Sequence, residues 1–189
     1  LLLGLHSSCS KEQGASAGPA GQGEKPSEKI VLRMGHFPNV THAQALVAHR
    51  LSRLAASGKG KGWFEERLGE NVTIQWYVYN AGPSAMEAIF AGSLDLTYVG
   101  PSPALNAFAR SKGEEIRIIS GSALGGSALV VQADGRIKTP ADFKGKKVAT
   151  PQLGNTQDVS AKHFLKEKFG DAAMQQVIPI PNAEQAAMM

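Results

Sequence analysis

The most constraining feature of this sequence is an alternation of strand-like and helix-like segments that begins at Ile30. Residues 30–35 and 72–79 are rich in β-branched and aromatic side chains, as strands are, and residues 42–56 between them repeat apolar side chains at helical spacing. Strands that alternate with helices form parallel sheets, because each helix carries the chain back to the edge where the next strand starts. The sequence therefore predicts an α/β fold.

The alternation continues along the rest of the chain, where local signals predict the ends of the helices. Ser84 and Glu87 have the spacing of a capping box, Thr139 precedes Pro140 as a helix cap would, and Asn182 is expected to cap a last helix. Further strands are predicted over residues 94–100, 116–120, 127–133, 147–149 and 177–180, and further helices over residues 103–111 and 156–169.

The N-terminal segment differs in composition from the rest of the chain. Apolar and small residues precede Cys9, the only cysteine, as at the end of an export signal, and the stretch resembles the lipobox at which bacterial lipoproteins are lipidated. Alternatively, Cys9 is a small residue near an ordinary cleavage site. We expect residues 1–9 to be the tail of a signal peptide and residues 10–29 to be a flexible linker. Residues 30–133 and 134–189 are the predicted first and second lobes.

Composition argues against several classes of function. The net charge of +4 is spread along the chain without the basic run of a nucleic-acid binder. One cysteine permits neither an internal disulfide nor a thiolate metal cluster, and the histidines lack the spacing typical of metal ligands. Ser102 has no evident histidine and acid to activate it. We therefore expect no catalytic residue, no metal and no cofactor.

Two segments with similar patterns are the main candidates for a binding site. "MGHFPNVTHAQAL" (34–46) and "VATPQLGNTQDVS" (148–160) each place asparagine and threonine between a strand and a helix. In open parallel sheets, ligands bind beyond the carboxyl ends of the strands, so a ligand between these loops is one interpretation. The other is that the asparagines and threonines only cap their helices. Asp158 has the same two interpretations, as a cap or as a contact for a ligand amine.

The chain resembles the substrate-binding proteins of bacterial ABC importers for nitrate, sulfonates and taurine. The stretches that carry the resemblance include "GSLDLTYVGPSPA" (92–104) and "TPQLGNTQD" (150–158). The resemblance implies a two-lobe periplasmic-binding-protein type II fold, with this sequence a fragment whose second lobe is incomplete. By matching position, it implies a solute site made of Phe37, Asn39, His42, Ser102, Gly126, Ser127, Asn155, Thr156 and Gln157.

The function implied by the resemblance is capture of a small oxyanion between the lobes for import. The expected partners are the small anionic solute and an ABC permease in the membrane. We expect a monomer in the periplasm or on the outer face of the cytoplasmic membrane. Its only attachment to the membrane is expected to be a lipid on Cys9. Two alternatives stay open, namely an enzyme of the pyrimidine-precursor-synthase type on a similar scaffold, and a sensor input domain.

Overall fold

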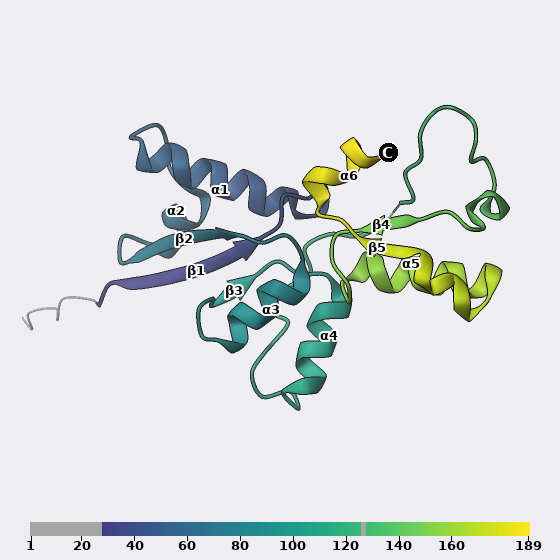
Figure 1. The fold of residues 1–189 in the computed structure, drawn as a ribbon. Helices are drawn as coiled ribbons and strands as arrows, with labels where there is room; N and C mark the ends of the chain where they lie inside the picture. The colour runs from purple at the N-terminus through teal and green to yellow at the C-terminus, as the bar shows by residue number, and fades with distance from the viewer. Residues whose placement is uncertain (1–27, 126–127) are drawn as a thin grey trace, which may run out of the picture.

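Parallel β-sheets flanked by helices make up the structure, which confirms the α/β prediction (Figure 1). The computed structural model describes residues 28–125 and 128–189. In chain order, its elements are β1 (Ile30–His36), the 3-10 helix η1 (Val40–His42), α1 (Ala43–Ala56), α2 (Trp63–Leu68), β2 (Val72–Val78), α3 (Gly82–Phe90), β3 (Leu96–Thr97), α4 (Pro101–Arg110), the 3-10 helix η2 (Pro140–Phe143), β4 (Val148–Thr150), α5 (Thr156–Phe169), the 3-10 helix η3 (Asp171–Gln176), β5 (Val177–Pro179) and α6 (Asn182–Met188).

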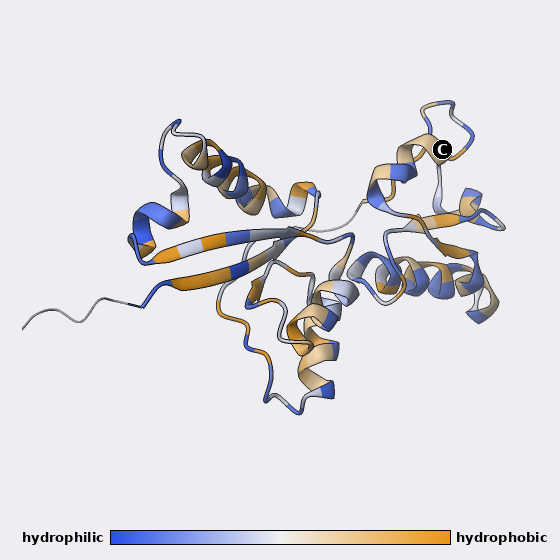
Figure 2. Cartoon of the chain, turned by 60° about the vertical axis from the view of Figure 1, so that its left-hand side comes forward, coloured by the Kyte–Doolittle hydropathy of each residue, from blue (hydrophilic) through white to orange (hydrophobic). Residues whose placement is uncertain are grey.

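The first sheet has the strand order β2-β1-β3, and both of its pairings are parallel. Met34 at the centre of β1 is paired with Trp76 of β2 on one side and with Leu96 of β3 on the other. Figure 2 shows hydrophobic residues along β1 and β2, whereas α2 and α5 are largely hydrophilic. The last three residues of β1 are buried, whereas β2 and β3 have no fully buried residue, so the carboxyl end of the central strand lies inside the protein.

Helices cover both faces of the first sheet, with α1 and α2 on one face and α3 and α4 on the other (Figure 1). On the first face, Trp76 stacks on His49 of α1, with ring centroids 5.2 Å apart, and its Nε1 donates a hydrogen bond to Ser52 Oγ at 3.0 Å. Phe64 of α2 contacts the same indole. We call this sheet with α1 to α4 the first lobe.

The second sheet consists of the parallel strands β4 and β5. Its core is the cluster of Val148, Ala161, Leu165, Ala173 and Val177, in which Leu165 is fully buried. The helix predicted over residues 156–169 has these bounds in the structure. We call this sheet with α5 the second lobe. The predicted boundary between residues 133 and 134 lies between the last helix of the first lobe and the first strand of the second. The exact position of this boundary stays a prediction.

Two predicted strands are wrong. Residues 116–120 and 128–133 form neither helix nor strand, while residue 127 lies outside the described residues. Ile118 and Ile119 are 68% and 76% exposed. A β-branched segment becomes a strand only where a neighbouring strand accepts its backbone hydrogen bonds, and no such neighbour lies beside these segments in the described part of the chain.

The helix ends follow the sequence signals in part. Thr139 and Asp142 form a capping box at η2. The proposed box of Ser84 and Glu87 is wrong, because α3 already begins at Gly82 and the Ser84 hydroxyl donates to Ala81 O at 2.9 Å. Asn182 is the first residue of α6 rather than its cap. Within residues 28–125 and 128–189, no helix combines the length and the apolar character that crossing a bilayer requires.

Candidate functional site

The loops that follow β2, β3 and β4 meet where the two lobes touch. The side-chain amide of Asn80, after β2, donates a hydrogen bond to Pro151 O, after β4, at 2.8 Å. The backbone amide of Ser102, after β3, approaches Thr156 Oγ1, at the start of α5, at 3.4 Å. Because parallel strands direct their carboxyl ends to one edge of a sheet, both lobes present helix starts here. We call residues 79–82, 98–102 and 150–158 the junction.

Close backbone approach at the junction depends on two glycines. A Cβ atom added to Gly100 would lie 2.2 Å from Thr156 Oγ1, across the lobe contact. One added to Gly82 would lie 2.3 Å from Pro103 Cγ, between α3 and α4. Both distances are far below van der Waals contact. A larger residue at either position would therefore force a neighbouring group to shift, the rigid Pro103 ring at Gly82 or the Thr156 side chain at Gly100.

The predicted residues of the first loop are held by contacts of their own. Asn39 Oδ1 accepts hydrogen bonds from the backbone and the hydroxyl of Thr41, both at 3.0 Å, so Asn39 caps η1. His42 is 6% exposed, and its Nδ1 accepts the Phe37 amide at 3.0 Å. Its ring lies 4.4 Å from the Phe37 ring and 5.9 Å from the Tyr98 ring. Tyr98 thus connects this loop to the junction.

Burial keeps His42 neutral at pH 7. Loss of hydration, and secondarily the nearby His36, lower the pKa of His42 from 6.5 to about 4. Since Nδ1 accepts the Phe37 amide, the neutral ring carries its proton on Nε2. The imidazole can therefore donate one hydrogen bond but brings no positive charge to a ligand.

The lowered pKa of His42 gives a testable dependence of stability on pH. Because the folded ring binds a proton only near pH 4 and the unfolded one near pH 6.5, the unfolded chain binds more protons between these values. The free energy of unfolding should therefore fall by about 2 kcal/mol between pH 6.5 and pH 4.5 from this group. Urea denaturation of His42→Asn, whose Oδ1 can replace Nδ1 as acceptor, should show a flatter pH dependence. An unchanged dependence in this variant, or an equal flattening in the exposed control His163→Asn, would contradict the assignment.

The second loop offers backbone donors at the start of α5. Asn155 Oδ1 accepts the Asp158 amide at 2.7 Å, and Asp158 Oδ2 accepts the Gly154 amide at 2.8 Å, so these two side chains cap the helix reciprocally. Gly154 has a φ of +78°, which favours glycine. The amides of Thr156 and Gln157 are the first of α5, where no intrahelical carbonyl can reach them. They lie at the positive end of the helix dipole, a place suited to an anion.

The first lobe supplies fewer backbone donors at its helix start. Pro101 and Pro103 flank Ser102 in the first turn of α4 and have no amide hydrogen. Ser102 therefore provides the only backbone N–H among residues 101–103, together with its hydroxyl. The structure thus brings Ser102 to Thr156, as the prediction of a shared site requires.

The predicted site residues that the structure describes carry no charge at neutral pH: Phe37, Asn39, His42, Ser102, Asn155, Thr156 and Gln157. Gly126, Ser127 and Cys9 lie outside the described residues. No group of three or more histidine, cysteine, aspartate or glutamate residues in the described ranges could hold a metal ion. The arrangement can donate hydrogen bonds to an anion through amides and hydroxyls.

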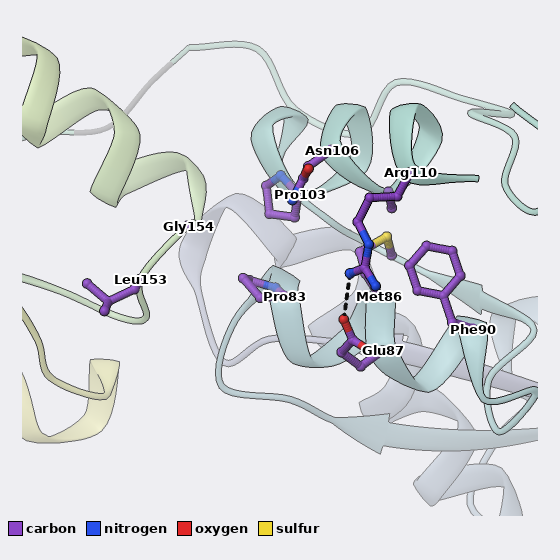
Figure 3. Close-up of a pocket in the computed structure, with 10 residues that line it drawn as sticks. Pro83, Met86, Glu87, Phe90, Pro103, Asn106, Arg110, Leu153 and Gly154 are labelled. Carbon is purple, nitrogen blue, oxygen red and sulfur yellow. Dashed lines mark hydrogen bonds and ion pairs between the residues drawn. The ribbon is translucent and has the colours of Figure 1, made fainter. Parts of the chain in front are cut away.

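A separate hollow of about 140 Å³ lies beside the junction, between α3, α4 and the Leu153–Gly154 turn (Figure 3). Arg110 and Glu87 form an ion pair of 2.9 Å across it, and Leu153 stands opposite on the second lobe. It is lined by Pro83, Met86, Glu87, Phe90, Pro103, Asn106, Ala107, Arg110, Leu153 and Gly154. None of the predicted site residues is in this lining, so the hollow and the predicted site are distinct.

Sequence reasoning missed two residues of the junction. Asn80 directly follows the predicted strand over residues 72–79, and its position after a strand end was a usable signal. Tyr98 is half-buried beside His42, and burial raises its pKa. Its place within a predicted strand gave no indication that it would connect two loops.

Comparison with known proteins places this geometry in a family. Residues 61–185 match the family model described as ABC transporter, phosphonate, periplasmic substrate-binding protein. A Bacillus subtilis (strain 168) protein named as an aliphatic sulfonates-binding protein is 30% identical over 92 residues, which are 48% of this chain and 28% of that protein. A 4,5-dihydroxyphthalate decarboxylase of Comamonas testosteroni is 41% identical over 44 residues, which are 23% of this chain and 13% of that enzyme.

A solved structure has the same fold. The alkanesulfonate-binding protein from Xanthomonas axonopodis pv. citri bound to MOPS is 24% identical, with a TM-score of 0.55 over 85% of this chain and 51% of that one. The chain thus spans about half the length of this solved relative. This likeness confirms the periplasmic-binding-protein fold. Because the family model matches more than half of the sequence, the chain belongs to the family of periplasmic substrate-binding proteins of ABC transporters.

Proposed function

We propose that the full-length protein is the extracytoplasmic solute-binding component of an ABC importer and binds a small oxyanion between its lobes. Family membership supports the transport role. The observation that supports an anion as the ligand is the geometry of the junction, where Thr156 at the start of α5 contacts the Ser102 backbone amide of the first lobe. Helix starts attract anions because their first amides are unpaired and the helix dipole is positive there.

An alkanesulfonate fits this site better than a phosphonate. A sulfonate keeps a single negative charge at every pH, whereas a phosphonate has a second proton to lose and becomes doubly charged as the pH rises into the alkaline range. Neutral donors can replace the hydration of one charge more easily than that of two. Four or five charge-assisted hydrogen bonds of about 1.5–3 kcal/mol each, less the cost of ordering, correspond to about micromolar affinity.

The proposed partners follow from the transport role. A membrane permease would receive the solute after the lobes close on it. The protein would work as a monomer outside the cytoplasmic membrane, anchored by a lipid on Cys9. Mass spectrometry of the purified protein would detect a lipid on Cys9, and an unmodified or absent Cys9 in the mature protein would contradict the anchor.

Enzymatic alternatives are less well supported. The likeness to the decarboxylase extends over only 44 residues. Within the described residues, no hydrogen bond joins the Ser102 hydroxyl to a histidine or an acid, and the hydrogen bond that joins Ser102 to the second lobe is that of its backbone amide with Thr156. Nucleophilic catalysis requires such an activating partner. A solute that is recovered chemically unchanged after incubation with the full-length protein supports a carrier, and turnover of it would support an enzyme. An attached output module in the full gene would support a sensor.

Calorimetric titration of the full-length protein tests the choice of ligand. We expect ethanesulfonate to bind with about micromolar affinity, and methylphosphonate to bind more weakly at alkaline pH, where it is doubly charged. Nitrate is the second oxyanion, and diethyl sulfone is the uncharged control. Binding of diethyl sulfone without binding of any of the anions would refute the proposed function.

Replacing Thr156 by alanine should weaken ethanesulfonate binding about tenfold, which is about 1.4 kcal/mol. The hydroxyl lies between the two helix starts, so its loss removes a polar group from the place proposed for the anion. Titration calorimetry measures the effect, and Ser160→Ala, an exposed change on the same helix, is the matched control. A lowered melting temperature with unchanged affinity would show that Thr156 only stabilises the start of α5.

A further inference from the structure

Two histidines of the first lobe form a hydrogen-bonded pair beneath the first loop. His36, the last residue of β1, is 2% exposed, and His49 on α1 is half-buried. Nε2 of His36 lies 2.9 Å from Nδ1 of His49, and the two rings meet edge to face with their centroids 5.1 Å apart. His49 also stacks on Trp76. The lobe therefore holds two titratable groups in contact, and neither belongs to the predicted solute site.

The hydrogen bonds of the pair determine where its protons lie. Nδ1 of His36 is 3.2 Å from Phe37 O, and because a carbonyl only accepts, this nitrogen carries a hydrogen. In the neutral pair, Nε2 of His36 then accepts from Nδ1 of His49, which leaves Nε2 of His49 without a hydrogen. The pair can thus bind one proton from solvent at this nitrogen, and gain one positive charge, while both hydrogen bonds stay in place.

The pair lies behind the loops that the first lobe contributes to the junction. β1 is the central strand of its sheet, with β2 and β3 on either side. Its end is bonded to the residues that follow both neighbours, since His36 O accepts the Tyr79 amide at 2.9 Å and Gly35 O accepts the Tyr98 amide at 3.0 Å. A charge on the pair would therefore act on a ligand at the junction from a buried position, where salt screens it little.

The described surroundings of the pair provide no negative charge to stabilise an added proton. Within the described ranges, no hydrogen bond or ion pair joins an acid to His36 or to His49. Burial, and then His36 and Arg53, lower the pKa of His49. The side chains around the pair are Arg53 of α1, Phe64 of α2, Trp76 of β2, His42 and Tyr98. None of these is negatively charged at neutral pH, so an anion at the junction would supply the missing charge.

We propose that the pair of His36 and His49 is a proton-binding site coupled to the solute site, so that binding of an oxyanion and uptake of one proton promote each other. The coupling is electrostatic, because the charged pair attracts the anion and the neutral pair does not. Linkage makes the effect reciprocal, so acid pH tightens solute binding and bound solute makes the pair take up its proton at higher pH. The inference rests on the proposed function and adds a counter-charge to the predicted site.

The pH dependence of solute binding tests the coupling. Calorimetry measures the dissociation constant of the full-length protein for ethanesulfonate at about pH 8 and about pH 5.5, in buffers without sulfonate groups, which would compete. Ethanesulfonate does not titrate in this range and His42 binds a proton only near pH 4. We expect binding to be at least about fivefold tighter at the lower pH. Equal dissociation constants would overturn this inference and leave the proposed function intact, whereas no binding at either pH would contradict the proposed function itself.

A variant of His49 assigns the pH dependence to the pair. His49→Phe keeps a ring beside Trp76 but has no nitrogen to bind the proton, and protonated His36 would then lack an acceptor for its Nε2 hydrogen. The change in affinity between the two pH values should therefore shrink to less than about twofold. His163→Gln, an exposed change on α5, is the matched control and should keep the full dependence. A full dependence in His49→Phe, or its loss in His163→Gln, would overturn the assignment.

NMR titration of the histidines tests the same coupling without a variant. The titration midpoint of the pair should rise by at least about 0.7 pH unit when ethanesulfonate is saturating, which is the fivefold change in affinity expressed on the pH scale. The midpoint of exposed His163 should stay the same and serves as the internal control. Equal midpoints of the pair with and without ethanesulfonate would overturn the inference, even if His49→Phe fails to fold.

Discussion

Replacing Gly100 by alanine is expected to weaken solute binding by about 30-fold, or about 2 kcal/mol. The φ of Gly100 is −73°, which alanine adopts without strain, so the effect comes from its Cβ, which would lie 2.2 Å from Thr156 Oγ1. To relieve the overlap, the Thr156 hydroxyl must turn away from Ser102 or the start of α5 must move away from it. The donors of the two lobes would then no longer converge on one anion. Titration calorimetry of the full-length protein with ethanesulfonate measures the loss.

The double variant Gly100→Ala with Thr156→Ala isolates the cause of this effect. Without the Thr156 hydroxyl, the nearest remaining atom to the new Cβ is the Thr156 Cβ, at 3.2 Å, a distance that a small shift accommodates. The double variant should therefore bind about as well as Thr156→Ala alone. If Gly100→Ala costs as much without the hydroxyl as with it, the effect does not arise from this contact.

Replacing Gly82 by alanine is expected to lower the free energy of unfolding by about 3 kcal/mol. Gly82 is buried at the start of α3, and a Cβ there would lie 2.3 Å from Pro103 Cγ and 3.1 Å from Val99 Cγ2. The proline ring is rigid, so α3 and α4 would have to separate. Urea denaturation monitored by circular dichroism measures the change.

Two further variants test this explanation. Gly121→Ala is the matched control, because a Cβ at Gly121 would have no neighbour within 4 Å, and it should leave stability unchanged. Adding Pro103→Ala to Gly82→Ala removes Cγ and should recover part of the loss. A Gly82→Ala protein as stable as the Gly121→Ala control would show that the two helices are not in fixed contact.

The sequence was sufficient for elements whose own residues determine their ends. The bounds of α5 were predicted because Asn155 and Asp158 cap its start and Gly170, with a φ of +86°, ends it. Residues 116–120 failed because strand formation depends on a neighbour that local sequence does not reveal. The six-residue helix α2 was missed because it is short, and the contact of its Phe64 with Trp76 is one that only the fold brings about.

Prediction of the candidate site had the same limit. Strand-end reasoning paired the loops 34–46 and 148–160, and only the family resemblance put Ser102 and Thr156 in one site. The structure brings these two residues close together, while their role in binding stays a prediction. Reasoning from spacing left open whether the asparagines cap or bind, and the structure shows that Asn39 and Asn155 both cap their helices. Their part in ligand binding stays a prediction. The pairing of Asn80 with Pro151 could not be predicted, because it depends on how two lobes meet.

The prolines at the start of α4 also determine how the contact between the lobes can be observed. Since Pro101 and Pro103 contribute no amide proton, an NMR or hydrogen-exchange experiment detects a single backbone amide in residues 101–103, that of Ser102. This amide faces Thr156 Oγ1 of the other lobe. Its exchange rate therefore reports on one inter-lobe contact without an added label, and it can follow the approach of the lobes while solute is titrated.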